Sequence, residues 1–452
     1  MEMILEFLRD VLSQPALLIG IMSCVGLIAL KRPFHKIMTG TLKPILGYLM
    51  LAAGAGVIVS NLDPLGKMIE HGFHITGVVP NNEAIVAVAQ KVLGVETMSI
   101  LVVGLLMNLL IARFTKFKYV FLTGHHSLFM ACLMSAVLGT AGLSGIELIL
   151  VGGFLMGAWS AISPAIGQSY TSKVTDGDEI ALGHFGSLGY YLSAWVAKYV
   201  GKAEESTEDI EIPEKWGFLR DSTLSTALTM IVFYLIAAIA AGSEFVATLS
   251  GSMSPYLFAV MSAMNFAVGV AIVYSGVRMI LGDLIPAFQG IATKIIPNAI
   301  PAVDCAVFFT YAPTAVVLGF ISSFIGGIIG MLILGAVGGV LIIPGLVPHF
   351  FCGATAGIYG NATGGRRGAA VGAFLNGLAI TFLPALALPV LGQLGFQNTT
   401  FGDADFAVMG LVLGNAFEWI GMAGIYGVVV IAALVLIIPN FIKTKGDCWQ
   451  YW

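Results

Sequence analysis

The sequence predicts an all-α, polytopic membrane protein, and three observations support that fold class. First, 58% of the 452 residues are hydrophobic and only 10% are charged, whereas soluble domains carry about 25% charged residues. Second, the apolar residues cluster into runs long enough to approach the roughly 30 Å hydrocarbon core of a bilayer. Third, the polar remainder gathers into short segments rich in Gly, Pro, His and Asp. Polar groups inside a membrane protein are typical of a transporter.

The apolar runs predict about eleven transmembrane helices, together with re-entrant hairpins and amphipathic helices, because several runs fall short of about 20 residues. The runs are 15–30, 45–59, 99–112, 120–138, 146–162, 224–241, 256–277, 303–318, 325–343, 374–391, 406–422 and 425–438. The N-terminal residues MEMILEFLRD lack a basic region and a cleavage site, so the first run is expected to remain as a span.

Basic residues mark alternate loops and so predict the orientation of the chain. They follow the first, third, fifth and seventh runs and the last one: Lys31, Arg32, Lys36, Lys43, Arg113, Lys116, Lys118, Lys198, Arg220, Arg278, Lys443 and Lys445. Cytoplasmic loops carry the excess of Lys and Arg. The N-terminus is therefore expected outside and the C-terminus in the cytoplasm, which requires an odd number of crossings.

One hydrophilic stretch, residues 198–222, interrupts an otherwise continuous membrane domain that spans residues 1–452. The simplest interpretation is a solvated cytoplasmic loop. Two alternatives remain: a face that binds a partner protein, and a hinge between two moving units.

Several classes of function are excluded or disfavoured. Basic residues are too sparse and scattered for nucleic-acid binding, and the sequence has no G-x-x-x-x-G-K-[ST] motif of an ATP-driven pump. It also lacks a TVGYG-like channel filter. The five cysteines are far apart, without metal-ligand spacing, and read as small buried hydrophobic residues; they are Cys24, Cys132, Cys305, Cys352 and Cys448.

Four polar segments do not read as plain lipid-facing helices: 122–130, 167–189, 282–305 and 342–368. Their Gly and Pro residues break helices and free backbone polar groups. In a membrane such backbone is tolerated only where it packs in protein or lines a cavity. Broken helices of this kind form the substrate sites of many transporters.

Asp304, at the start of an apolar run, is the best functional candidate, because an unpartnered carboxylate costs about 2.5–3.5 kcal/mol at the bilayer centre. It could accept hydrogen bonds from sugar hydroxyls or act as a base on one of them. The alternative is a helix N-cap. His125 and His184 are candidates as well, against the alternative of satisfied core histidines. His126 should point elsewhere on its helix and is expected to be structural.

The remaining charged groups have structural interpretations. Arg278 and Asp283 are expected to form an ion pair. Arg366 and Arg367 fit either the cap of a re-entrant helix or a contact with a phosphate-bearing partner, and the sequence does not separate these.

These segments resemble the ascorbate-type enzyme IIC, the membrane component of the bacterial phosphoenolpyruvate–sugar phosphotransferase system. The resemblance covers nearly the whole chain in the family's order. The matching motifs are LTGH (122–125), VTDG (174–177), LGH (182–184), KAEESTEDIEIP (202–213), GVRM (276–279), IPNAIPAVDCA (296–306), YAPTAVV (311–317), VLIIPG (340–345) and GGRRGA (364–369).

The resemblance implies a sugar permease of the bacterial cytoplasmic (inner) membrane. It implies a homodimer whose protomers each have a static, V-motif-like dimerisation part and a mobile core that carries sugar by an elevator-like movement. Enzyme IIB, which receives its phosphoryl group from enzyme IIA, would then phosphorylate the sugar from a phosphocysteine. This chain would hold no phosphoryl-carrying residue, and no cofactor or metal is expected.

The resemblance also implies a set of sugar-binding residues, with Asp304 in addition as the catalytic candidate: Gly54, Ala55, Asn82, His125, Phe129, His184, Phe185 and Asp304. Three of them depart from the ascorbate pattern, because Phe129 and Phe185 replace glutamines and Asn82 replaces a threonine. Two lost amides remove up to four donors and two acceptors, and aromatic rings favour stacking on a sugar ring instead. A related sugar or sugar acid is therefore the alternative to ascorbate.

A second class of function stays open beside the permease. An ion-coupled secondary transporter of a small polar solute would use Asp304 and the histidines as a proton relay. Transport that needs a proton gradient and continues without enzyme IIB would favour it.

Overall fold

The computed structural model describes Val11 and residues 14–74, 77–80, 82–177, 179–210, 222–392 and 399–441. Its helices are α2 (Pro15–Ala29), α3 (Phe34–Phe73), α4 (Asn82–Phe114), α5 (Gly124–Thr140), α6 (Gly145–Val174), α7 (Ser187–Val200), α8 (Ser222–Ala241), α9 (Ser243–Ser250), α10 (Pro255–Lys294), η2 (a 3₁₀ helix, Cys305–Thr310), α11 (Pro313–Ala336), α12 (Leu346–Gly392), α13 (Ala404–Ile420) and α14 (Met422–Phe441). The strands are β1 (Val79–Pro80), β2 (Tyr119–Phe121), β3 (Ala181–Leu182), β4 (Ile300–Val303) and β5 (Thr399–Thr400). Because no strand exceeds four residues, the all-α prediction is confirmed.

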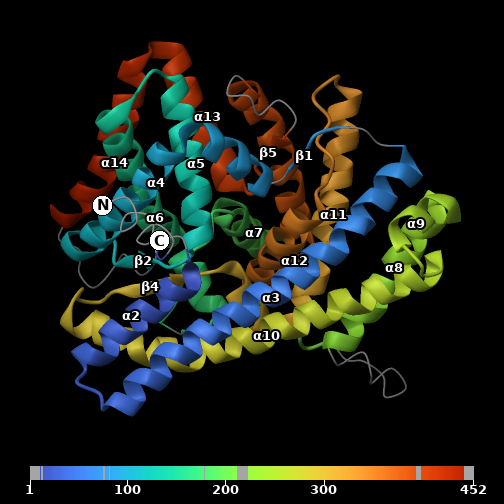
Figure 1. Ribbon diagram of the computed structural model, residues 1–452, viewed down its shortest axis with the longest axis horizontal. Helices are drawn as coiled ribbons and strands as arrows, with labels where there is room; N and C mark the ends of the chain where they lie inside the picture. Colours follow the sequence, from blue (N-terminus) through green and yellow to red (C-terminus); the bar gives the residue numbers. More distant parts are fainter. Residues whose placement is uncertain are drawn as a thin grey trace.

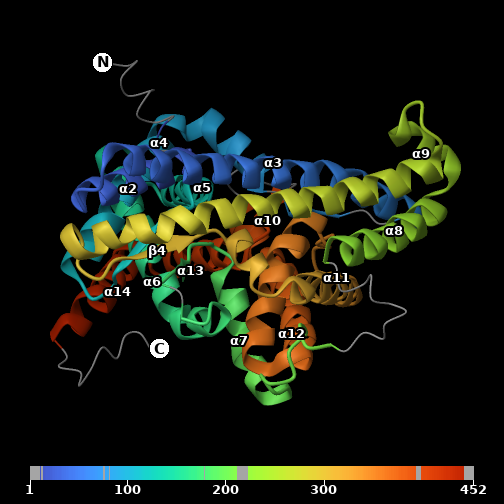
Figure 2. The ribbon, with the colours of Figure 1, turned by 90° about the horizontal axis from the view of Figure 1, so that it is seen from below.

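Two long helices, α3 and α10, run antiparallel along the length of the molecule (Figures 1 and 2). Glycines let them approach closely: a Cβ on Gly47 would lie 2.8 Å from the carbonyl oxygen of Gly276, and one on Gly54 would lie 2.7 Å from that of Gly269. Small residues permit such contacts between membrane helices. Helices α2 and α8 pack on the same pair and α9 packs on α10. We call these five helices the long-helix group.

The expected ion pair between Arg278 and Asp283 is wrong. Asp283 instead pairs with Lys43 of α3 at 3.5 Å. Residues five apart on a helix point about 140° away from each other, so Arg278 and Asp283 face different sides of α10.

Helix α12 folds back on itself at Gly364 and Gly365, where the backbone leaves helical φ/ψ. Both limbs of this hairpin lie against α11. A Cβ on Gly353 would lie 2.4 Å from the side chain of Ser323, and one on Gly377 would lie 2.0 Å from the carbonyl oxygen of Ser323. Helix α7 packs along α12, and α7, α11 and α12 form what we call the hairpin group (Figure 2).

The remaining helices, α4, α5, α6, α13 and α14, pack with one another into a third group, which occupies the upper left of Figure 1. Its apolar core is largely separate from the core shared by the long-helix and hairpin groups. Asp304, His125 and Tyr48, three residues of the candidate site, lie where the groups meet.

A small parallel sheet gathers three of the polar segments. Its order is β2-β4-β3, with Leu182 opposite Val303. His125 follows β2, His184 follows β3 and Asp304 follows β4. Because the strands are parallel, their carboxyl ends lie at one edge of the sheet, and these three side chains are brought together there.

A second parallel pair joins distant parts of the chain in the same way. Strand β1 pairs with β5, with Val79 opposite Thr399. Asn82 follows β1 and Asp403 follows β5, so the two side chains also come close together.

Seven of the described helices are long and apolar enough to cross a bilayer, or eight if the bent pair α8–α9 forms one span. The multi-pass membrane prediction is confirmed. Helices α2, α5 and α13 have 15, 17 and 17 residues and would extend only about 22–26 Å. The number of eleven spans and the outward N-terminus stay predictions.

The hydrophilic stretch 198–222 is described up to residue 210 and again at 222, and its residues 211–221 lie outside the described part. The described part packs on the tip of the α12 hairpin. The backbone N–H of Arg366 donates to the carbonyl oxygen of Glu205 at 2.8 Å, and that of Thr207 donates to Oδ1 of Asn361 at 2.8 Å. At this tip the stretch therefore follows the protein surface. Both arginines of the tip, Arg366 and Arg367, are exposed.

Glu208 caps α11 from this stretch. Its Oε1 accepts the backbone N–H groups of Thr314 and Ala315, each at 3.1 Å. These groups belong to the first turn of α11 and have no partner within the helix. We expect Glu208→Ala to lower the free energy of unfolding by about 1 kcal/mol, the usual effect of losing an N-cap, measured by denaturant unfolding in detergent. Glu204→Ala, at a nearby exposed residue, should leave stability unchanged; equal losses in both variants would contradict the capping role.

Candidate functional site

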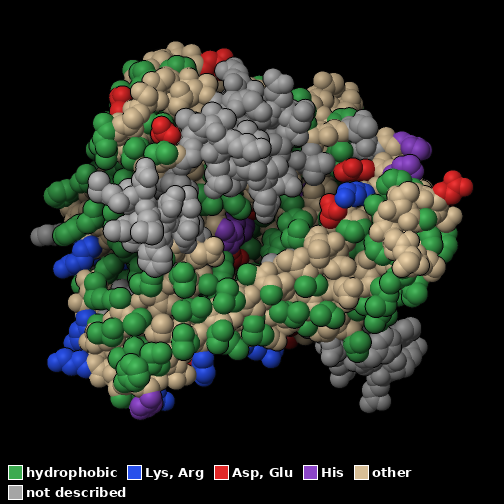
Figure 3. All heavy atoms as spheres, viewed as in Figure 1, with side chains coloured by type: hydrophobic (Ala, Val, Ile, Leu, Met, Phe, Trp, Pro, Cys, Tyr) green, Lys and Arg blue, Asp and Glu red, His purple; other side chains and the backbone are tan. Residues whose placement is uncertain are grey.

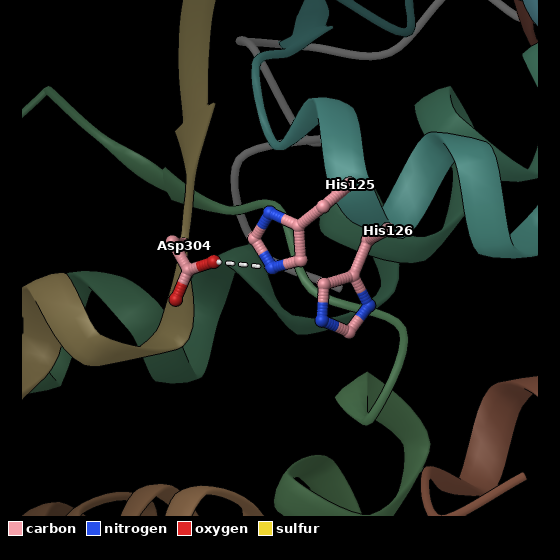
Figure 4. A group of neighbouring side chains, drawn as sticks. All are labelled: His125, His126 and Asp304. Carbon is pink, nitrogen blue, oxygen red and sulfur yellow. Dashed lines mark ion pairs between the residues drawn. The ribbon is translucent and has the colours of Figure 1, made fainter. Parts of the chain in front are cut away.

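The candidate site lies at the carboxyl edge of the β2-β4-β3 sheet. Figure 4 shows Asp304 at the end of β4, facing His125 on the first turn of α5, with His126 beside it. Histidine side chains are also visible at the bottom of a hollow in Figure 3. The site thus joins segments that lie about 180 residues apart in the chain.

Asp304 is buried, and each of its carboxylate oxygens has a separate partner. Oδ1 accepts the backbone N–H of Ala306 at 3.0 Å and so caps η2. Oδ2 faces Nε2 of His125 at 3.4 Å. The capping interpretation is therefore confirmed, whereas the sugar-binding and catalytic roles of Asp304 stay predictions; the cap fixes the direction in which Oδ2 points.

His125 connects this carboxylate to the long-helix group. Its side chain is 37% exposed, and its Nδ1 lies 3.1 Å from the hydroxyl of Tyr48 on α3. A cavity of about 10 Å³ lies beside Asp304, and Ile19, Tyr48 and Ile280 of the long-helix group line one wall of it. Tyr48 is a site residue that the sequence did not reveal, because a tyrosine in an apolar helix gives no distinguishing signal.

His126 was expected to point elsewhere on its helix and to be structural; its ring lies in the cluster, so the expected direction is wrong, and the structural role stays a prediction. Its ring centroid lies 3.8 Å from that of His184, and its Nδ1 accepts the backbone N–H of Phe185 at 3.4 Å. Neighbouring residues on a helix point about 100° apart. The segment after β3 covers the side of α5 that His126 faces, so both histidines are in the cluster.

His184 is buried and held through one ring nitrogen. Its Nδ1 accepts the backbone N–H of Gly186 at 3.1 Å and lies 2.9 Å from the hydroxyl of Tyr190. Oδ1 of Asp403 lies 3.8 Å from the same nitrogen. Since backbone amides occupy Nδ1 of both His126 and His184, their Nε2 atoms are the ones left for another partner.

Asn82, at the start of α4, is tied to the loop before α13. Its Nδ2 donates to Oδ2 of Asp403 at 2.6 Å, and its Oδ1 accepts the backbone N–H of Gly402 at 2.9 Å. Asp403 also accepts a hydrogen bond from Sγ of Cys352 at 2.9 Å. Asp403 was not predicted from the sequence, although the acidic pair in FGDADF (401–406), at the start of an apolar run, was a usable signal.

The two phenylalanines expected at the sugar differ in their surroundings. Phe129 lies on α5 with its ring centroid 5.8 Å from that of His125. Phe185 is fully buried and stacks on Phe121 at 4.6 Å, with Phe406 on another side. Phe129 is therefore next to the exposed histidine, whereas Phe185 packs behind the cluster.

The structure does not bring Gly54 to this cluster. It is buried in the contact between α3 and α10, where even a methyl group would meet Gly269 and Val273. Ala55 follows in the same helix, and its side chain lies outside the described part. For both residues the sugar-binding role stays a prediction.

Donor atoms for a cation lie close together in the cluster. Three sets, each within 4.8 Å, share these residues: His125, His126 and Asp304; His126, His184 and Asp403; His184, Asp304 and Cys305. Several of these atoms already serve the hydrogen bonds described above. Among the described residues, no Lys or Arg forms an ion pair with Asp304 or Asp403.

The fold and this cluster together define a multi-pass membrane protein with a polar site enclosed by helices. Residues 10–405 match the EIIC-GAT family, described as the PTS system sugar-specific permease component. The chain belongs to this family.

One relative is the "Ascorbate-specific PTS system EIIC component" of Mycoplasma pneumoniae, which is 26% identical over 417 residues. The match covers 79% of this chain and 62% of the relative. The chain thus spans less than two thirds of the length of that protein.

Proposed function

We propose that this chain moves ascorbate, or a related sugar or sugar acid, across the bacterial cytoplasmic membrane for phosphorylation by a separate enzyme IIB. Family membership supports the permease class, and the name of the Mycoplasma relative supports ascorbate-like substrates. The observation that carries the proposal is Asp304. Its Oδ2 faces the half-exposed ring of His125 at 3.4 Å, an arrangement able to accept a hydrogen bond from a sugar hydroxyl.

The proposed movement is elevator-like, with the long-helix group as the static dimerisation part and the other two groups as the mobile core. Most of the site residues belong to the proposed mobile core, while Tyr48 contacts them from α3. The cavity beside Asp304 is about 10 Å³, whereas pockets for small molecules measure about 300–1,000 Å³. In the proposed movement, the long-helix group and the mobile core would separate around Asp304 to admit the sugar. In this proposal two copies of the chain form a homodimer. Enzyme IIA supplies the phosphoryl group to enzyme IIB.

In the phosphorylation step, a sugar hydroxyl would attack the phosphorus of the phosphocysteine on enzyme IIB. Asp304 would accept the hydroxyl proton as the new O–P bond forms and the S–P bond breaks, leaving the cysteine thiolate as the leaving group. The chain itself would carry no phosphoryl group.

The test is uptake and phosphorylation in membrane vesicles that contain this protein, with enzyme I, HPr, the cognate IIA and IIB and phosphoenolpyruvate inside. Radiolabelled ascorbate would be compared with pentoses, hexitols and aldonates. Phosphorylation of ascorbate that depends on enzyme IIB is the expected result. Phosphorylation of another sugar alone would keep the mechanism and change the substrate. Accumulation of unphosphorylated sugar without enzyme IIB would instead support the ion-coupled alternative.

Phe129 gives a prediction about the choice of sugar. We expect Phe129→Gln to strengthen ascorbate binding several-fold, because it restores an amide beside His125, and each matched hydrogen bond contributes about 0.5–1.5 kcal/mol. Equilibrium binding of radiolabelled ascorbate would measure this change.

Phe185→Gln is the comparison for this experiment. It would place an amide among the buried rings of Phe121 and Phe406, so we expect it to lower thermal stability. An unchanged ascorbate affinity in Phe129→Gln would show that Phe129 does not select the sugar.

A further inference from the structure

Asp403 is a buried carboxylate that lies close to residues from three other parts of the chain. It follows β5, and its Oδ2 accepts from Nδ2 of Asn82, at the start of α4, at 2.6 Å. Its Oδ1 accepts from Sγ of Cys352 on α12 at 2.9 Å and faces Nδ1 of His184 at 3.8 Å. No described Lys or Arg pairs with it.

A carboxylate in such surroundings keeps its charge only if hydrogen bonds replace the lost water, because an unsatisfied buried charged group is costly. The groups that donate hydrogen bonds to Asp403 are therefore restricted to positions within hydrogen-bond distance of its oxygens. Its two hydrogen bonds fix the amide of Asn82 and the thiol of Cys352, and the ring of His184 lies beside them, 3.8 Å from Oδ1.

We propose that Asp403 is a positioning residue of the sugar site. It holds the amide of Asn82 in place beside His184, without touching the sugar itself. The inference rests on the proposed function, since it assumes that Asn82 and His184 contact the substrate. It adds a residue that neither the sequence resemblance nor the family match assigns.

Asp405 provides a matched comparison in the same stretch of chain. It is as buried as Asp403 and equally well bonded: it accepts from Nε1 of Trp159 at 3.2 Å, Oγ of Ser187 at 2.7 Å and the backbone N–H of Leu188 at 2.9 Å. These groups belong to α6 and to the first turn of α7. Asp405 therefore anchors helices and makes no hydrogen bond to Asn82 or to His184.

Exchanging the side chains of Asn82 and Asp403 tests the positioning role separately from an effect on general stability. Asp403→Asn replaces one carboxylate oxygen with a donor, so residue 403 can no longer accept from both Asn82 and Cys352. Asn82→Asp would place two carboxylates 2.6 Å apart. In the double variant, Asn82→Asp with Asp403→Asn, the amide at 403 again donates to the carboxylate at 82. That carboxylate still accepts the N–H of Gly402.

The experiment measures binding of radiolabelled ascorbate, and of the same sugar panel, to the full-length protein in lipid nanodiscs, with thermal unfolding in parallel. We expect each single variant to weaken sugar binding about 10-fold or more, as removal of a hydrogen bond to a charged group does. The double variant should bind sugar more tightly than either single variant, because the hydrogen bond between residues 82 and 403 is restored, although residue 82 then offers the sugar a carboxylate. Asp405→Asn should lower the unfolding temperature and leave the sugar Kd of the folded protein unchanged.

The possible failures are distinguishable. Wild-type affinity in Asp403→Asn, or a double variant no better than the singles while the wild type binds sugar, would overturn the positioning role and leave the permease standing. Equal loss of sugar binding in Asp405→Asn would also overturn it, since stability alone would then explain the effect. A wild type that binds none of these sugars would overturn the proposed function, and the inference with it.

Discussion

Asp304→Asn is expected to abolish phosphorylation of the sugar while leaving expression and folding intact. The reason lies in the two separate contacts of the carboxylate. Asn is as good an N-cap as Asp, so the amide oxygen can still accept the N–H of Ala306 and keep η2 in place. The variant loses only the negative charge at Oδ2, which faces His125. Because a positioned general base contributes about 10²–10⁴-fold, we expect the rate to fall at least 100-fold.

The measurement is the rate of phosphorylation by enzyme IIB in vesicles, together with sugar binding in its absence. Asp283→Asn is a suitable control, since that carboxylate pairs with Lys43 at the periphery and its loss should leave the rate unchanged. Asp304→Ala should lose stability as well as activity, because it removes the cap. Wild-type turnover in Asp304→Asn would rule out the role assigned to the carboxylate.

Much of this site followed from the sequence for a simple physical reason. His125, His184 and Asp304 each lie in a segment where Gly or Pro interrupts an apolar run, and such interruptions inside a membrane need protein partners. The structure satisfies them with three short parallel strands, and the residues that follow the strands meet at one edge. The resemblance supplied Asn82, which the pairing of β1 with β5 brings to Asp403.

The parts that could not be predicted depend on contacts between distant elements. Tyr48 looks like any tyrosine of an apolar helix until α3 crosses the site and its hydroxyl meets His125. His126 was assigned to another face because a helical wheel shows directions only, whereas the loop after β3 determines what each direction meets. Asp403 likewise gains its importance from partners in three other elements.

The path of α12 was also only partly predictable from the sequence. Helix α12 reverses direction at Gly364 and Gly365, where GGRRGA interrupts the apolar pattern of the sequence. The reversal determines that both limbs lie against α11 and that the first limb presents Cys352 to Asp403. Local composition therefore indicated a break, and only the packing on α11 gave its geometry.

Gly365→Val is expected to cause the largest loss of stability of the substitutions considered, because two independent constraints require glycine there. The backbone at Gly365 has φ 58° and ψ −155°, a region open essentially to glycine alone and costing about 1–3 kcal/mol for other residues. A Cβ would also lie 2.3 Å from the carbonyl oxygens of both Lys202 and Glu205. Backbone atoms cannot rotate away as a side chain can, so the hydrophilic stretch would have to leave the hairpin tip.

Thermal unfolding in detergent measures this effect, with Gly365→Ala as a milder variant that still meets both carbonyl oxygens. We expect Gly365→Val to lose more than about 3 kcal/mol of stability, from strain and clash together. Gly427→Ala in α14 is the control, because a Cβ there meets nothing within 4 Å and alanine favours a helix. Since the first limb of the hairpin carries Cys352, sugar binding should weaken in Gly365→Ala too. Unchanged stability and sugar affinity in that variant would mean that the tip moves independently of the site.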